Sequence, residues 1–425
     1  MSHGKHAGVG TPRPLGEGRV ELGRAEKGVR ERVGERVAAL APRLREVARF
    51  LKEHPELGHE EYEAQRLLCS HLEEDGFRVE RGLAGLPTSF RAQYPPGGGG
   101  RPRIAFLAEY DALPEIGHGC GHNLIAAMSL GAALALRDEV ARDHGTVLVL
   151  GSPAEETTGG KIAMCEAGVF DDLDAAMLVH PGWRTAVGGS SLASHPVEIE
   201  FFGRAAHAAA APEKGINALD AMLLTFQAVH ALRPRLDPGV RLPGIILNGG
   251  TAPNVVPDYT RARFSLRAPD ARYLEETVVP AVLDCARGAA RATGCRLEWR
   301  FYEPLFLDMK ENPVLARLFA QHMRDLGYEV EELPPTARGG STDVGNVSYR
   351  VPALQPSVAI GNPPPPGHTR EFAEATLSET ALRAMLDACT ALALTGARLL
   401  HEPALVQEAW QAWHQAVCKQ GVDSR

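Results

Sequence analysis

The sequence contains several short segments whose side chains could bind metal ions or move protons. One of them, AEYDALPEIGHGCGHN at 108–123, holds Asp111, Cys120 and His122. Cys120 and His122 are two residues apart, so on an extended chain both side chains can face the same site. A thiolate and an imidazole together suit a borderline-soft divalent ion such as zinc. Taken alone, this pattern is only a weak indication of a metal site, because a polar loop that contains a buried free cysteine also accounts for it.

Three further segments place ligand-type residues close to predicted strands. Glu155 and Glu156 follow the apolar run at 146–152, His180 ends another apolar run, and His368 lies in a proline-rich loop. Ligand sites in open α/β sheets gather at the carboxyl ends of the strands. We therefore expect these side chains to converge. In a pair of glutamates, one can bind a metal ion while the other takes a proton from the attacking water.

The elements that must position these residues form an alternating pattern. Apolar residues recur every three or four positions over 27–52, which predicts an amphipathic helix. A buried strand is expected at 103–108 and a Gly/Ala-rich helix at about 121–137. Strands that alternate with helices predict an α/β fold, with a mostly parallel sheet flanked by helices. Residues 1–26 are rich in glycine, proline and charge, and are predicted to form a disordered tail.

The pattern changes between residues 195 and 304. Strand-like and helix-like stretches follow one another there in the order β-α-β-β-α-β, which is typical of a ferredoxin-like α+β unit. Pro280 should interrupt the second of its helices, because proline lacks a backbone N–H. We predict that this unit is a domain inserted into a catalytic metal-binding domain formed by residues 27–194 and 305–425.

The composition excludes several other classes of protein. The net charge of −8 provides no basic surface for nucleic acid. The sequence contains no apolar run close to the roughly 20 residues of a membrane span, and its first residues lack the apolar stretch of a secretory signal. Seven irregularly spaced cysteines do not form a disulfide framework. A cytoplasmic protein without nucleic-acid or membrane partners is expected.

The sequence resembles the zinc metallopeptidase superfamily of aminoacylases, carnosinases and glutamate carboxypeptidases. It is most similar to the amidohydrolase branch, which contains hippurate hydrolases, auxin-conjugate hydrolases, p-aminobenzoyl-glutamate hydrolase and related dipeptidases. The resemblance extends from about residue 30 to 400. It rests on the ordered motifs HPELGHEEYEAQRLL, AEYDALPEIGHGCGHN, SPAEETTGGK, DAAMLVHP, GRAAHAAAAPEKGINALDA, GGTAPNVVPD, GGSTDVGNVS and GHTREFAEA.

This resemblance implies two divalent metal ions per chain, with zinc favoured over manganese, cobalt or nickel. Cys120 would bridge the two ions, and Asp111 would support the metal site. Glu155 would act as the general base and later donate a proton to the leaving amine. The implied metal ligands are Cys120, His122, Glu156, His180 and His368.

The resemblance also implies roles for the inserted domain, as a lid and as the interface of a homodimer. His207 would reach the active site of the partner subunit and stabilise the oxyanion. Asn254 and Arg267 would bind the carboxylate of the substrate, and the loop that contains Gly340 and Ser341 would line the same pocket.

The expected activity is therefore metal-dependent hydrolysis of the amide bond in an N-acyl amino acid or a dipeptide. An alternative is a carboxypeptidase-type enzyme that releases glutamate from p-aminobenzoyl-glutamate or folate-like conjugates. Asn123 stands where hippurate hydrolases carry an aspartate, which weakens the transfer of hippurate specificity. Two interpretations without catalysis are an inactive ligand-binding relative and a structural zinc protein. The presence of Glu155 argues against the first, and the dispersed, carboxylate-rich ligand set argues against the second.

Overall fold

The computed structural model describes residues 24–361, 363 and 365–418. The tail that the sequence predicts at 1–26 lies outside this range except for its last three residues. These belong to helix α1 (Arg24–Glu53), so the first helix begins slightly earlier than predicted.

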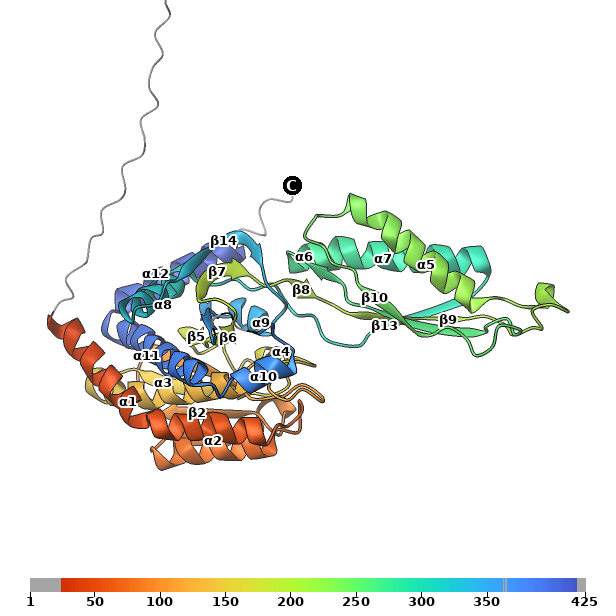
Figure 1. Ribbon diagram of the computed structural model, residues 1–425. Coiled ribbons are helices and arrows are strands. Elements are labelled where there is room, and N and C mark those ends of the chain that lie inside the picture. Colours follow the sequence, from red (N-terminus) through yellow and green to blue (C-terminus); the bar gives the residue numbers. More distant parts are fainter. Residues whose placement is uncertain (1–23, 362, 364, 419–425) are drawn as a thin grey trace, which may run out of the picture.

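The larger part of the molecule is built around a six-stranded sheet in the order β1-β2-β4-β3-β5-β15 (Figure 1). Strands β4, β3, β5 and β15 are parallel, whereas β1 and β2 extend the sheet with antiparallel pairings. The sheet is thus mixed, with its parallel half next to the site. Its strands are β1 (Arg78–Arg81), β2 (Phe90–Tyr94), β3 (Arg103–Glu109), β4 (Thr146–Ser152), β5 (Ala175–Met177) and β15 (Ala353–Leu354).

Long helices complete this core. Helices α3 (His122–Asp143) and α11 (Glu379–His401) pack against each other and against α1, and α3 also packs against β3. α3 continues about six residues beyond the predicted end. The remaining helices of this part are α2 (Tyr62–Glu74), η1 (Leu83–Gly85), α4 (Gly160–Glu166), α8 (Pro313–Asp325), α9 (Val344–Ser348), α10 (Arg370–Ala375) and α12 (Pro403–Cys418).

A second, four-stranded sheet in the order β14-β7-β16-β6 was not expected from the sequence. It corrects the predicted position of His180 at the end of an apolar strand, because β5 ends at Met177 and His180 begins a new strand, β6, in this other sheet. β6 separates from β5 because it pairs with β16. The strands of the second sheet are β6 (His180–Gly182), β7 (Ala186–Ser190), β14 (Glu331–Arg338) and β16 (Ser357–Ala359).

The segment after residue 195 has its own sheet and its own apolar core. Its elements follow the predicted order β-α-β-β-α-β, and two helices pack on one sheet of order β10-β11-β9-β13 (Figure 1). They are β9 (Val197–Phe202), η2 (Pro212–Lys214), α5 (Ala218–Leu232), η3 (Arg233–Arg235), β10 (Gly244–Asn248), β11 (Tyr259–Phe264), α6 (Ala271–Tyr273), η4 (Leu274–Val278), α7 (Val279–Thr293) and β13 (Arg296–Phe301).

Pro280 has the predicted effect on the second helix. It lies in the first turn of α7, directly after the π-helical turn η4, so its missing N–H falls where the regular helix restarts.

The two parts are joined at a narrow junction. β8 (Ala193–Ser194) pairs with β12 (Arg267–Ala268), and Ser194 also forms a bridge with Phe306 on the returning chain. Arg267 therefore lies where the chain passes between the two parts. Within the described residues, none of the helices is long and apolar enough to cross a membrane.

Candidate metal centre and active site

The Cys-Gly-His sequence lies where the chain turns from a loop into α3. Gly121 caps the helix with a φ of +81°, and a Cβ atom on it would lie 2.6 Å from Cγ of Pro181. Only glycine meets both demands without strain. Gly121 thus lets Cys120 and His122 approach the strand that begins at His180.

The five predicted ligands come together, although they are far apart in the sequence. The Sγ atom of Cys120 lies 3.5 Å from Nε2 of His180 and 3.5 Å from Nε2 of His368. Four groups of three candidate ligands have all their donor atoms within 4.8 Å of one another, and Cys120 belongs to two of them. The first set is Cys120, His122 and His180, and the second is Cys120, Glu156 and His368. This arrangement can hold two ions that share one thiolate.

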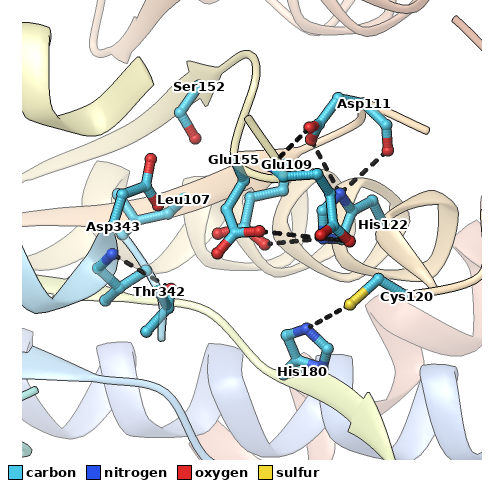
Figure 2. Close-up of polar contacts among 12 residues, drawn as sticks. Leu107, Glu109, Asp111, Cys120, His122, Ser152, Glu155, His180, Thr342 and Asp343 are labelled. Carbon is cyan, nitrogen blue, oxygen red and sulfur yellow. Dashed lines mark hydrogen bonds and ion pairs between the residues drawn. The ribbon is translucent and has the colours of Figure 1, made fainter. Parts of the chain in front are cut away.

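A hydrogen bond to Asp111, on the side of the ring away from the other ligands, orients the His122 imidazole, as Figure 2 shows. Nδ1 of His122 donates a hydrogen bond of 2.9 Å to the Asp111 carboxylate. Its Nε2 atom then offers a lone pair, is buried and has no hydrogen-bond partner, and the same is true of Oε1 of Glu156. The two atoms are 3.8 Å apart. Buried polar atoms without partners are costly, so this pair fits a cation.

The charge state of Cys120 also fits bound cations. Burial raises the pKa of its thiol, although the neighbouring His122 lowers it. Without positive charge the thiol would stay protonated, whereas coordination to a divalent ion deprotonates it.

Glu155 lies beside the ligands, with its carboxylate 3.9 Å from Nε2 of His122 (Figure 2). Burial and the nearby carboxylates of Glu109 and Asp343 raise its pKa well above the usual value. The preceding residue, Ala154, has a φ of +59°, which is uncommon for a residue with a side chain. Its N–H donates a 2.8 Å hydrogen bond to the buried carboxylate of Glu61. Glu61 thus holds the strained turn that presents Glu155.

A buried lysine balances part of the negative charge behind Glu155. Nζ of Lys161 lies 2.7 Å from carboxylate oxygens of both Glu109 and Asp343, and all three side chains are inaccessible to solvent. Burial disfavours the ammonium, but the two carboxylates raise the pKa of Lys161, so it stays charged. Sequence analysis missed the roles of Lys161 and Glu61. Asp343, which follows the loop with Gly340 and Ser341, lies behind Glu155 and contacts Lys161.

The ligands open into a cavity of about 520 Å³ that reaches across the junction between the two parts. Arg267, Gly340 and Ser341 line this cavity together with Cys120 and Glu155, as predicted for residues of one pocket. His207 and Asn254 do not line it. They lie next to each other in the inserted segment, where the Ala208 N–H donates to the Asn254 carbonyl. Within one chain, these two residues are therefore separate from the metal ligands.

Comparison with known proteins gives consistent results. Residues 105–394 match the family model described as peptidase family M20/M25/M40. The chain is 38% identical to the Xaa-Arg dipeptidase of Mus musculus over 392 residues, covering 89% of this chain and 90% of the relative. It is 30% identical over 462 residues to one of the subunits of the p-aminobenzoyl-glutamate hydrolase of Escherichia coli (strain K12), covering 91% and 94% of the two chains.

The fold is also found in a solved structure from Bacillus subtilis, described as a dinuclear metal binding peptidase from the M20 family. The two structures superpose with a TM-score of 0.64 at 23% identity, covering 86% of this chain and 99% of the other. The family match spans more than half of the chain and includes the strands and loops that carry the ligand cluster. The chain therefore belongs to peptidase family M20/M25/M40 and is a metal-dependent amide-bond hydrolase.

Proposed function

We propose that this enzyme hydrolyses the amide bond of dipeptides or N-acyl amino acids at a site with two divalent ions, zinc in the first instance. The observation that carries the proposal is the position of Cys120. It is shared by two sets of three candidate ligands, and Glu155, which belongs to neither of these sets, lies next to His122 and Glu156. The ions would be held by Cys120, His122, Glu156, His180 and His368.

When bound, the two ions would polarise the scissile carbonyl and make the attacking water more acidic. Glu155 takes the proton from that water and passes it to the leaving amine, a role that requires a carboxyl group within hydrogen-bond reach of both. Asp111 fixes the tautomer of His122. Lys161 offsets the carboxylates behind Glu155, so that Glu155 is not surrounded by negative charge alone.

Arg267 is proposed to bind the carboxylate of the amino acid that leaves. It lines the same cavity as Glu155, and a guanidinium can bind a carboxylate with two parallel hydrogen bonds. Gly340 and Ser341 would form the adjacent wall. Since one relative is an Xaa-Arg dipeptidase, we propose dipeptides as the principal substrates. Hydrolysis of p-aminobenzoyl-glutamate is the alternative, suggested by the second relative.

We further propose that the enzyme is a homodimer that pairs through the inserted segment, residues 195–304. β10 is an edge strand, and its residues Ile245, Ile246 and Leu247 are exposed. Leu223 and Leu224 of α5 are exposed as well. Apolar residues on an open strand edge favour pairing with a second copy. The described cysteine side chains are unpaired, which favours the reducing cytoplasm as the location.

In such a dimer, His207 and Asn254 would serve the site of the partner. The His207 ring is exposed, and its Nδ1 atom accepts hydrogen bonds of 3.2 and 3.1 Å from the N–H groups of Ala209 and Ala210. The Nε2 atom is thereby left as the donor for an oxyanion.

Metal analysis tests the proposed centre directly. After reconstitution and removal of loosely bound ions, elemental analysis should give about two equivalents of metal per chain. His180→Ala and His368→Ala should each lower this value, because they belong to different ligand sets. One equivalent in fully active protein would contradict the shared thiolate, and none would contradict the mechanism.

The contribution of the partner can be tested by mixing two inactive variants. His207→Ala and Glu155→Gln should each be inactive alone. In an equilibrated equal mixture, half of the dimers are mixed, and each has one intact site, so activity should recover to about a quarter of wild type.

The control for this experiment is the double variant His207→Ala/Glu155→Gln mixed with Glu155→Gln, which can form no intact site. If subunit exchange is verified and the first mixture remains as inactive as the control, His207 does not act across a dimer.

A further inference from the structure

Part of the active-site cavity is not explained by metal binding or by recognition of a carboxylate. This region lies along β7 and β16, next to His180. Ser357 in β16 is the register partner of His180, and Gln355 lies two residues earlier on the same face of the chain. At about 3.3 Å per residue, Gln355 is roughly 7 Å farther along than Ser357. Both residues line the cavity, as does Glu311.

A hydrogen bond from the backbone of Gly188 in β7 positions Glu311 in this region of the cavity. The N–H of Gly188 donates a 2.7 Å hydrogen bond to Oε1 of Glu311. β7 and β16 are antiparallel at Ala186 and Ser357, so Gly188 and Gln355 lead away from that pair in the same direction. The Glu311 carboxylate and the Gln355 side chain therefore line the cavity on the same side of the Ala186–Ser357 pair.

Glu311 has no positive partner among the described residues. It forms no ion pair, and its hydrogen bond from Gly188 involves only one of its two oxygens. Burial raises the pKa of Glu311 to about 7, and only the Gly188 N–H opposes this shift. Another acid of the cavity is Glu303, and burial raises its pKa as well, but there the nearby Arg267 and Arg263 oppose the shift. Glu311 is thus an acid that forms no ion pair among the described residues, although Arg184, Arg267 and Arg338 line other parts of the cavity.

Gln355 provides an independent observation. Its Oε1 atom is buried and has no hydrogen-bond partner. Buried acceptors are normally satisfied, and an unsatisfied one costs free energy. Two side chains that line one cavity with the metal ligands thus have free acceptor capacity, namely the second oxygen of the Glu311 carboxylate and Oε1 of Gln355. A group with several N–H donors and a positive charge would satisfy both of them.

We propose that Glu311 and Gln355 form a subsite for a cationic nitrogen group of the substrate, a guanidinium or an ammonium. The inference rests on the proposed function, since it names the kind of dipeptide that the same cavity selects. Gln355 lies roughly 7 Å along the chain from Ser357, which is the register partner of His180. This distance suits the end of a long basic side chain on a residue next to the scissile bond. Glu311 is a specificity-determining residue in this proposal and takes no part in bond cleavage.

The test compares a substrate pair that differs only in charge. Ala-Arg and Ala-citrulline have side chains of nearly the same shape, but citrulline ends in a neutral urea. Wild-type enzyme should prefer Ala-Arg in kcat/KM by about 10- to 100-fold, the loss expected for charge-assisted hydrogen bonds. Glu311→Gln should reduce this preference to about 1, while kcat/KM for Ala-citrulline stays within about threefold. A purely structural role for Glu311 would lower both substrates equally.

Glu331→Gln is a matched control. Glu331 is an acid of the strand beside β7, but it already forms an ion pair with Arg184 at 3.1 Å. Its replacement should leave the preference for arginine unchanged. A third substrate, N-acetyl-Ala-Arg, distinguishes the side chain from the amino terminus. If the subsite holds the N-terminal ammonium instead, acetylation and Glu311→Gln will cause the same, non-additive loss, and citrulline will be as good as arginine.

Binding without turnover provides a second measurement. In the metal-loaded Glu155→Gln background, calorimetry should show tighter binding of Ala-Arg than of Ala-citrulline, and Glu311→Gln should remove the difference. The subsite is refuted if neither charged group of the dipeptide depends on Glu311 in these assays. Failure of the proposed function has a different signature, in which metal-loaded wild-type enzyme cleaves no dipeptide or N-acyl amino acid at all.

Discussion

Glu155→Gln should lower kcat by about 100- to 10,000-fold, while the protein keeps its fold and its metal content. Glutamine has the same shape as glutamate but cannot accept the proton of the attacking water or return it to the leaving amine. Glu155 belongs to neither of the two ligand sets that share Cys120, although it also lies within 4.8 Å of His122 and Glu156, so both of these sets stay intact in the variant. The measurement is steady-state turnover of a dipeptide at saturating metal, with metal content determined on the same sample.

The adjacent residue provides a matched comparison. Glu156→Gln removes a ligand that lies 3.8 Å from His368, so its main effect should be a loss of bound metal that added metal partly restores. Turnover of Glu155→Gln near the wild-type level, with two ions bound, would show that another group moves the proton.

Lys161→Met should destabilise the protein by about 3–5 kcal/mol, the usual cost of removing one partner from a buried ion pair. Nζ of Lys161 lies between Glu109 and Asp343, and all three side chains are inaccessible to solvent. Without the ammonium, these carboxylates and Glu155 would repel one another in a region that excludes water. The free energy of unfolding in urea, measured on the metal-free protein, gives the effect without a contribution from bound ions.

Lys52→Met is a suitable control, because Lys52 pairs with the largely exposed Glu374 at the surface. Such a pair contributes about 0–1 kcal/mol. The double variant Lys161→Met/Asp343→Asn removes one of the stranded charges and should recover part of the lost stability. If Lys161→Met is within about 1 kcal/mol of wild type, the buried lysine does not compensate the carboxylates around it.

Local sequence patterns were sufficient to find the residues that follow buried strands. Arg103–Glu109 and Thr146–Ser152 are continuous apolar runs, so the loops after them, with Cys120 and Glu155, could be placed at one edge of a sheet. The order of the elements after residue 195 was also predicted, because the alternating strands and two amphipathic helices follow one another in a regular pattern. Both features depend on interactions that are short in sequence.

Features that depend on distant pairing could not be predicted. His180 was assigned to the end of β5, although it begins β6, because the strand that pairs with it is Ser357–Ala359, far along the chain. β14 contains Pro334 and Pro335, which normally argue against a strand, and it lies at the edge of its sheet, where proline is tolerated. Lys161 and Asp343 are 182 residues apart, and no local pattern links them.

The narrow junction between the two parts has a mechanical consequence. A body that turns about a hinge moves each of its points in proportion to the distance from the axis. Arg267 lies in the β8–β12 pairing at the junction, whereas His207 lies in the loop after β9, which leads away from it (Figure 1). Rotation of the inserted segment would therefore barely displace Arg267 but would swing His207 through a wide arc. The same few degrees of movement would leave the proposed contact between Arg267 and the substrate carboxylate in place but would change the position of His207, the proposed oxyanion donor.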